Sequence, residues 1–254
     1  MKFFNRTIPV LVPIIIFAII EQIFQAPKQI YWLLPLSFVV LVVAVWQLVG
    51  RQLFRQQFWR FIIAPSLLLF SGLMFLSFLE GKLLRQIFLF GLAILLWSFL
   101  EVLFIRLHAS NRYQTHSLEN ISIDLNLIIL FLTASGFFSL MIFLGVDWWF
   151  LLPALVIIVA LLTVELVWSG ETNRQVGVLY ILVITLITAE IFWSVSFLPT
   201  SVYVNGLIVT LGYYLMTGLA RNWLLGVRQL KALKRYLLIS ALCFIIIIVT
   251  AKWF

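Results

Sequence analysis

Long apolar runs follow one another along almost the whole chain, and they constrain its fold more than any other feature of the sequence. A run of about 20 apolar residues crosses the hydrocarbon core of a bilayer as a helix, because that core is about 30 Å thick. Short polar breaks separate such runs throughout the 254 residues. With 64% hydrophobic residues, 10% charged residues and a mean hydropathy of +1.17, the chain is excluded from the class of soluble globular proteins.

The runs predict an all-α, polytopic membrane helix bundle of about nine transmembrane helices arranged as successive hairpins. One transmembrane domain would then occupy residues 1–254, with no soluble domain. The connections around Pro27 and between Gly145 and Asp147 are very tight, so eight spans, with one bent element in place of two helices, is the alternative. The predicted spans are 8–25, 30–49, 61–79, 84–105, 121–145, 148–168, 176–197, 201–220 and 236–253.

The positions of the basic residues predict the orientation of the bundle. Short cytoplasmic loops of membrane proteins carry an excess of Lys and Arg. With the N-terminus inside, thirteen of the seventeen basic residues and five of the nine acidic residues lie on the inner side, which then holds the whole net charge of +8. The sequence therefore predicts a multi-pass protein of a bacterial or archaeal cytoplasmic membrane, with its C-terminus outside, and it favours nine spans over eight.

Glu190 is the deepest carboxylate in the predicted spans. It lies about seven residues, or roughly 10 Å, from the outer end of its span, and an ionisable group inside a bilayer is a functional-site hypothesis by default. Two interpretations stay open. Glu190 is either structurally paired or protonated, or it belongs to a proton, ion or substrate pathway.

Three other carboxylates lie nearer to the ends of their spans. Glu21 is close in sequence to Lys28, and Glu101 is close to Arg106. Glu165 lies near an inner end. For all three the simpler interpretation is an interfacial carboxylate with a nearby partner.

The eighth predicted span carries a polar and small-residue face. Asn205 and Gly212 flank this face. It predicts either close helix packing with hydroxyl hydrogen bonds or the lining of a polar pathway for a substrate or ion. Helical spacing places the following residues on the face: Gly206, Thr210, Tyr213, Thr217 and Arg221.

The stretch from His108 to Asn126 is the only sustained polar segment. It contains the weak catalytic candidates His108, His116, Glu119 and Asp124, residue types that act as acids, bases or metal ligands. Their spacing matches no established motif, so no metal site and no cofactor are expected. The simpler interpretation is a cytoplasmic connection that ends in a helix cap at Thr115 or Ser117.

Two inner segments, 51–60 and 221–235, alternate basic with apolar residues. Such segments favour a helix that lies on an anionic lipid surface, and the second could also dock an acidic cytoplasmic partner. Nucleic acid is not expected as a partner. The basic residues assigned to this lipid or partner surface are Arg51, Arg55, Arg60, Arg228, Lys231, Lys234 and Arg235.

Glycines and prolines mark the ends of the predicted spans. Gly81, Gly145 and Gly170 are predicted to be turn residues. Five prolines are expected in or near first helical turns, where the missing amide costs little. They are Pro9, Pro13, Pro35, Pro65 and Pro153.

These observations favour a non-enzymatic membrane component, either a small permease or the membrane-embedded subunit of a transport or assembly complex. Its expected partners are membrane lipids, anionic at the inner face, and other membrane or cytoplasmic subunits. The first alternative is a membrane enzyme that acts on a lipid or lipid-linked substrate at the cytoplasmic face. The second alternative is a purely structural packing subunit.

Overall fold

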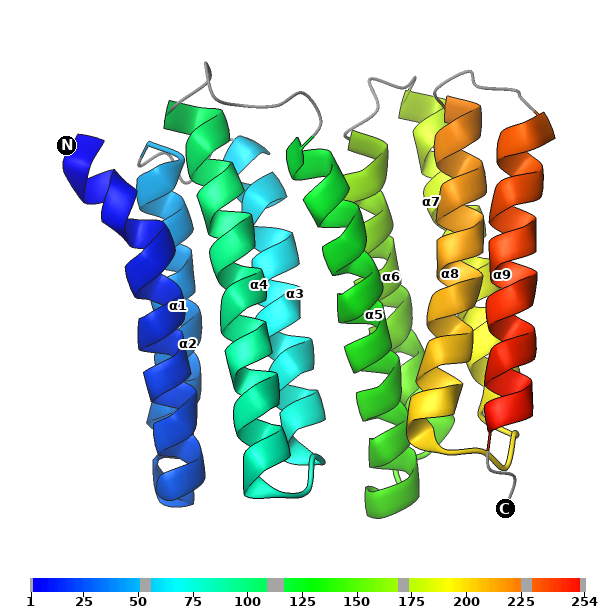
Figure 1. Cartoon of the computed structure of the whole chain (residues 1–254), viewed down its shortest axis with the longest axis horizontal. Helices are drawn as coiled ribbons and strands as arrows, with labels where there is room; N and C mark the ends of the chain where they lie inside the picture. The colour runs from blue at the N-terminus through cyan, green and yellow to red at the C-terminus, as the bar shows by residue number, and fades with distance from the viewer. Residues whose placement is uncertain (1, 51–55, 109–116, 169–173, 225–229, 252–254) are drawn as a thin grey trace. The chain divides into compact units, whose positions relative to one another are not determined.

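The computed structural model of the chain describes residues 2–50, 56–108, 117–168, 174–224 and 230–251, and within these ranges it is all-α. Nine α-helices and one short 3-10 turn, Pro27–Gln29, make up the described part (Figure 1). The helices are α1 (Lys2–Gln25), α2 (Ile30–Leu48), α3 (Gln56–Ser77), α4 (Lys82–His108), α5 (Ser117–Leu144), α6 (Trp148–Trp168), α7 (Arg174–Val195), α8 (Val202–Leu224) and α9 (Leu230–Thr250).

Seven of these helices are long and apolar enough, over their described residues, to cross a membrane. They are α1 to α5, α7 and α8. In α6 the described apolar stretch, Trp148–Val164, is shorter than in these seven helices. Helix α9 is not among the seven. The chain is therefore a multi-pass membrane protein with a helical bundle, as predicted, whereas nine crossings stay a prediction.

The two tightest connections separate distinct helices. α1 ends at Gln25 and α2 begins at Ile30, and α5 ends at Leu144 before α6 begins at Trp148. Gly81 and Gly145 have φ angles of 88° and 64°, in the left-handed region that favours glycine, so both are turn residues as predicted. Gly170 lies outside the described residues.

The expectation for the prolines is wrong for α1. This helix begins at Lys2, six residues before the predicted span, so Pro9 and Pro13 lie in its interior. Pro65 is also well inside α3. Proline is tolerated inside membrane helices because neighbouring helices and local adjustments satisfy the backbone groups it leaves unpaired.

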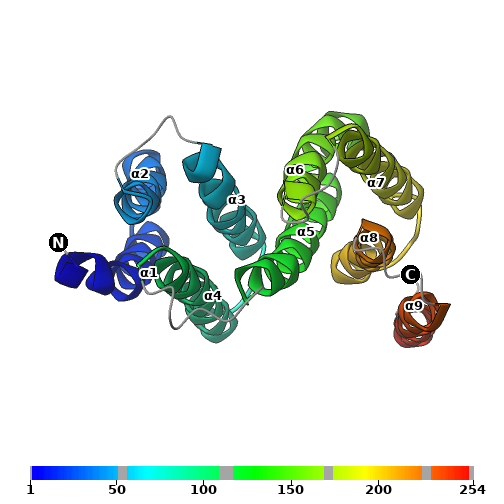
Figure 2. The same cartoon turned by 90° about the horizontal axis from the view of Figure 1, so that it is seen from above.

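Residues Met1–Leu125 form one compact unit, and residues Asn126–Phe254 form a second. In the first unit α1 packs against both α4 and α2, and α3 packs against α2 and α4 (Figure 2). In the second, α7 packs against α6 and α8, and α9 packs against α8. The prediction of one transmembrane domain without a soluble part stays a prediction.

Candidate functional site

Helix α8 contacts three neighbours of the second unit through three glycines. A Cβ atom at Gly206 would lie 3.1 Å from the backbone nitrogen of Ser135 in α5. At Gly212 it would meet the Ile191 side chain of α7, and at Gly218 the ring of Tyr236 in α9. Because six residues turn an α-helix by about 240°, a spacing of six directs these glycines to three different sides. α8 is thus closely packed on each side that carries a glycine.

The predicted polar face of α8 is largely buried, and its threonine hydroxyls donate to their own helix. Thr210 Oγ1 donates to the Gly206 carbonyl at 2.8 Å, and Thr217 Oγ1 donates to the Tyr213 carbonyl at 2.8 Å. Tyr213 is 1% exposed and Thr217 is 5% exposed. Arg221, in the last turn of α8, is partly exposed. These contacts are those of close helix packing, and the pathway assigned to the same residues stays a prediction.

Two further polar features of the second unit are a side-chain hydrogen bond at the start of α8 and a buried amide in α5. Thr200 lies just before α8, and its Oγ1 donates to the side-chain oxygen of Asn205 in the first turn of that helix. Asn126 Nδ2 of α5 donates to the Leu162 carbonyl of α6 at 3.3 Å. In the part of the chain that the structure describes, the buried Ser135 Oγ and Asn126 Oδ1 accept or donate no hydrogen bond. Asn126 and Asn205 stand out in the sequence as polar residues, but nothing in the sequence predicts their hydrogen-bond partners.

Glu190 lies on the exposed side of α7 and not in the interior of the second unit. It is five residues before the helix end at Val195, which is about 7.5 Å along the axis. Large exposed side chains share its face at helical spacing. They are Leu179, Leu182, Leu186 and Trp193.

The polar segment brings no metal site together in the described residues. His108 is exposed at the end of α4, where its ring stacks on Phe104 with centroids 5.1 Å apart. Asp124 is exposed on α5. His116 and the Glu119 side chain lie outside the described residues. Within the part that is described, no three His, Cys, Asp or Glu side chains form a possible metal site, and a catalytic role for these residues stays a prediction.

The basic segments are parts of long helices where the structure describes them. Arg60 lies in α3, and Lys234 and Arg235 are exposed in the first turns of α9. The expected surface helices therefore do not occur as separate elements within the described ranges. Arg51, Arg55 and Arg228, and the Lys231 side chain, lie outside them.

Glu101 pairs with an arginine that the sequence analysis did not assign to it. Arg6 Nη1 donates to Glu101 Oε1 at 2.6 Å, although the two residues are 95 positions apart. Arg106 lies over the Phe61 ring, with its Cζ atom 5.8 Å from the ring centroid, and its pairing with Glu101 stays a prediction. Glu21 forms no ion pair with Lys28 in the described structure. Glu165 has its side chain outside the described residues.

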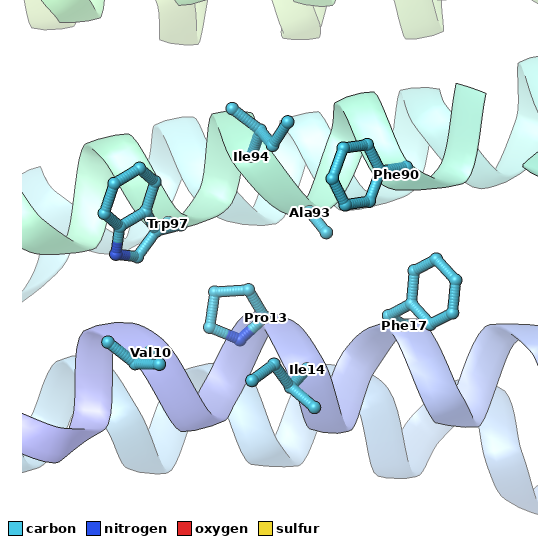
Figure 3. Close-up of a pocket in the computed structure, with 8 residues that line it drawn as sticks. All are labelled: Val10, Pro13, Ile14, Phe17, Phe90, Ala93, Ile94 and Trp97. Atoms are coloured by element: carbon cyan, nitrogen blue, oxygen red, sulfur yellow. The ribbon is translucent and has the colours of Figure 1, made fainter. Parts of the chain in front are cut away.

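An apolar groove of about 450 Å³ runs between α1 and α4 (Figure 3). One face of α1 from Val10 to Phe17 forms one wall, and one face of α4 from Phe90 to Trp97 forms the other. On each helix the groove residues are spaced so that they lie on one face, but the sequence of either helix alone is that of an ordinary apolar membrane span. Only the antiparallel pairing of α1 with α4 reveals the groove, so the groove could not be predicted from the sequence.

Residues 8–250 match the family described as protein of unknown function, DUF5656. The chain belongs to this family. The match to DUF5656 begins within α1 and ends at the last residue of α9, so it includes the groove, the packed face of α8 and Glu190, whereas Arg6 precedes it. No curated protein and no solved structure gives a significant match.

Proposed function

We propose that this DUF5656 protein is the membrane-embedded, non-enzymatic subunit of an assembly, and that it binds another membrane protein through the exposed face of α7. The observation that carries the proposal is the position of Glu190. Its carboxylate lies on an exposed apolar face, inside a helix that is long and apolar enough to span the membrane.

The surroundings of Glu190 supply it with no counter-charge. No ion pair involves it among the described residues. The second unit has three described cationic side chains, Arg221, Lys234 and Arg235. Because α8 begins near the end of α7 that carries Glu190, these cations lie at the far end of α8 and at the adjoining start of α9, away from Glu190. An unpaired carboxylate in a span is costly, and such groups are normally paired or face a polar environment.

The proposed partner therefore presents a Lys, an Arg or another hydrogen-bond donor within one of its own membrane helices. Leu186 lies one turn before Glu190 on the same face, and Trp193 lies about one turn after it. These large side chains would pack against the partner helix around the polar contact. The Trp193 ring also lies beside Trp148 of α6, with ring centroids 6.0 Å apart and the ring planes tilted by 45°, and tryptophan is enriched at membrane interfaces.

The permease, the membrane enzyme and the purely structural packing subunit stay predictions. A permease needs a polar route beside α8, and the threonine hydroxyls there bond to their own helix. A membrane enzyme needs His108, His116, Glu119 and Asp124 to act together. We therefore place the assembly role first.

The test is a photo-crosslinking experiment at Leu186. A photoreactive phenylalanine analogue there, introduced into the full chain in native membranes, is expected to capture a membrane protein whose crosslinked span carries a Lys, an Arg or another donor. Glu190→Gln should remove most of this product, because the amide loses the charge that the partner recognises. Glu80→Gln, a change at an exposed carboxylate between α3 and α4, is the matched control and should leave the product intact.

Three outcomes would contradict the proposal. One is capture that Glu190→Gln leaves unchanged. Another is capture of a span that has no donor side chain. The third is the same product from a probe at Leu238, an exposed residue of α9 that lies away from this face.

A further inference from the structure

An arginine fixes the α1–α4 pair near each end of the groove. At one end Arg6 of α1 pairs with Glu101 of α4. At the other end Arg85 of α4 lies over the Phe24 ring of α1, 4.3 Å from its centroid. These contacts hold two antiparallel helices, while the apolar walls between them remain open to the outside of the unit.

The groove has the chemistry of a site for a hydrocarbon chain. Its walls extend for about 10 Å along α1, since Val10 and Phe17 are seven residues apart. Val10 is 48% exposed, Phe90 is 62% exposed and Ile94 is 44% exposed, whereas Pro13 is buried. Because α1 and α4 are both candidate membrane spans, the molecules that reach this groove are lipids.

The Arg6–Glu101 pair lies directly beyond one end of the groove. Arg6 is four residues before Val10, and Glu101 is four residues after Trp97, so both stand one turn further along the faces that form the walls. The Arg6 side chain is 57% exposed. A guanidinium has five N–H donors, and the described structure uses one of them for Glu101. The others are available to a phosphate, for which the guanidinium is well shaped.

Two further features favour an anionic lipid with its headgroup at this end. The cations Arg6, Arg60 and Arg106 lie at this end of α1, α3 and α4, and basic residues near a membrane surface attract anionic headgroups. The indole nitrogen of Trp97 lies on the side of its ring toward Val10 (Figure 3). Its N–H is a donor of the kind that a lipid ester carbonyl accepts.

We infer that the α1–α4 groove binds one acyl chain of an anionic phospholipid, whose phosphate binds Arg6. Glu101 orients the guanidinium, and Trp97 faces the region between the phosphate and the chain. This site is independent of the partner surface on α7, so failure of either proposal leaves the other standing.

Photo-crosslinking in nanodiscs tests the inference. The full chain is placed in phosphatidylcholine nanodiscs with a small fraction of phosphatidylglycerol that carries a diazirine in one acyl chain. Crosslinks should concentrate in peptides that contain residues 10–17 and 90–97, and a phosphatidylcholine probe of the same chain should give a weaker signal there. Ala93→Phe should remove most of this signal, because a ring at position 93 fills the groove. Ala241→Phe, on the exposed side of α9, adds the same volume elsewhere and should leave it unchanged.

A pair of charge variants separates headgroup binding from a structural role of the ion pair. Arg6→Gln should abolish the preference for phosphatidylglycerol. Glu101→Gln breaks the same ion pair but keeps the arginine, so that preference should persist or increase. Circular dichroism and gel filtration verify that each variant is folded, and Ala93→Phe tests the groove without touching the ion pair.

Either of two results would overturn the inference. Crosslinks at residues 10–17 and 90–97 that Ala93→Phe leaves intact would show general contact with surrounding lipid. Equal labelling by the two headgroups, or equal losses in Arg6→Gln and Glu101→Gln, would show that Arg6 binds no phosphate.

Discussion

At Gly206 the backbone of α8 lies against the backbone of α5. A Cβ atom there would come within 3.1 Å of the Ser135 nitrogen and 3.2 Å of its Cβ atom, neither of which can move without its helix. At Gly206 the Ser135 Oγ atom is closer still, whereas at Gly212 all three nearest atoms belong to the Ile191 side chain, with its flexible Cδ1 end the nearest. The same added methyl group therefore meets very different resistance at two positions of one helix.

Gly206→Ala is expected to destabilise the protein by roughly 1–2 kcal/mol, because overpacking costs more than the helix gains when glycine is replaced. Denaturant unfolding in detergent, followed by circular dichroism, measures the change. Gly212→Ala is the matched control and should cost clearly less. Equal losses for the two variants would mean that α8 is not held against the α5 backbone.

The pairing of Glu101 shows what residue-level prediction can and cannot reach. Its position near the inner end of a span predicted an interfacial carboxylate with a partner, and a partner is present. Arg106 was the cation noted beside it in the sequence, whereas the ion pair that the structure shows is with Arg6, 95 positions away. Local spacing tells which residues share a helix face, but it does not tell which helix lies opposite. The groove beside this pair was missed for the same reason.

At the scale of the element, the helices and turns were largely predictable. Each turn is encoded in a few adjacent residues, and Gly81 and Gly145, predicted as turn residues, both adopt positive φ. Helix starts were predicted less well: α1 begins at Lys2 and α3 at Gln56, each several residues before the predicted span. Hydropathy detects the apolar part of a helix, whereas the backbone can continue into the polar residues that precede it.

The turn between α3 and α4 should depend on the backbone freedom of Gly81. Gly81 has φ 88° and open space where a Cβ would lie, so Gly81→Ala adds backbone strain without a clash and is expected to cost about 1–2 kcal/mol. Gly91→Ala, within α4 and also in open space, should instead gain about 0.5–1 kcal/mol. Unfolding of both variants in detergent measures the difference, and a stabilising Gly81→Ala would contradict this account of the turn.

At the scale of the whole molecule, hydropathy establishes that the chain crosses the membrane more than once, whereas the charges only predict its orientation. Seven apolar helices establish a multi-pass membrane protein. The orientation rests on the thirteen basic residues assigned to the inner side. The number of crossings depends on whether α6 and α9 span the membrane. A crossing by α6 also determines on which side of the membrane the turn between α7 and α8 emerges.

Cysteine labelling of intact cells decides both the orientation and the crossing by α6. Cys243 is the only cysteine, so Cys243→Ser provides a background for single cysteines. Asp147→Cys, before α6, and Ser196→Cys, after α7, should both react with a membrane-impermeant maleimide, because nine crossings with the N-terminus inside place both turns outside. Lys234→Cys, in the positively charged inner region, should react only after the cells are permeabilised. If α5 and α6 instead crossed as one bent element, Asp147→Cys would be protected within the membrane, Ser196→Cys would emerge inside and Lys234→Cys would emerge outside. With nine crossings in the opposite orientation, Lys234→Cys would be labelled in intact cells, and both Asp147→Cys and Ser196→Cys would react only after permeabilisation.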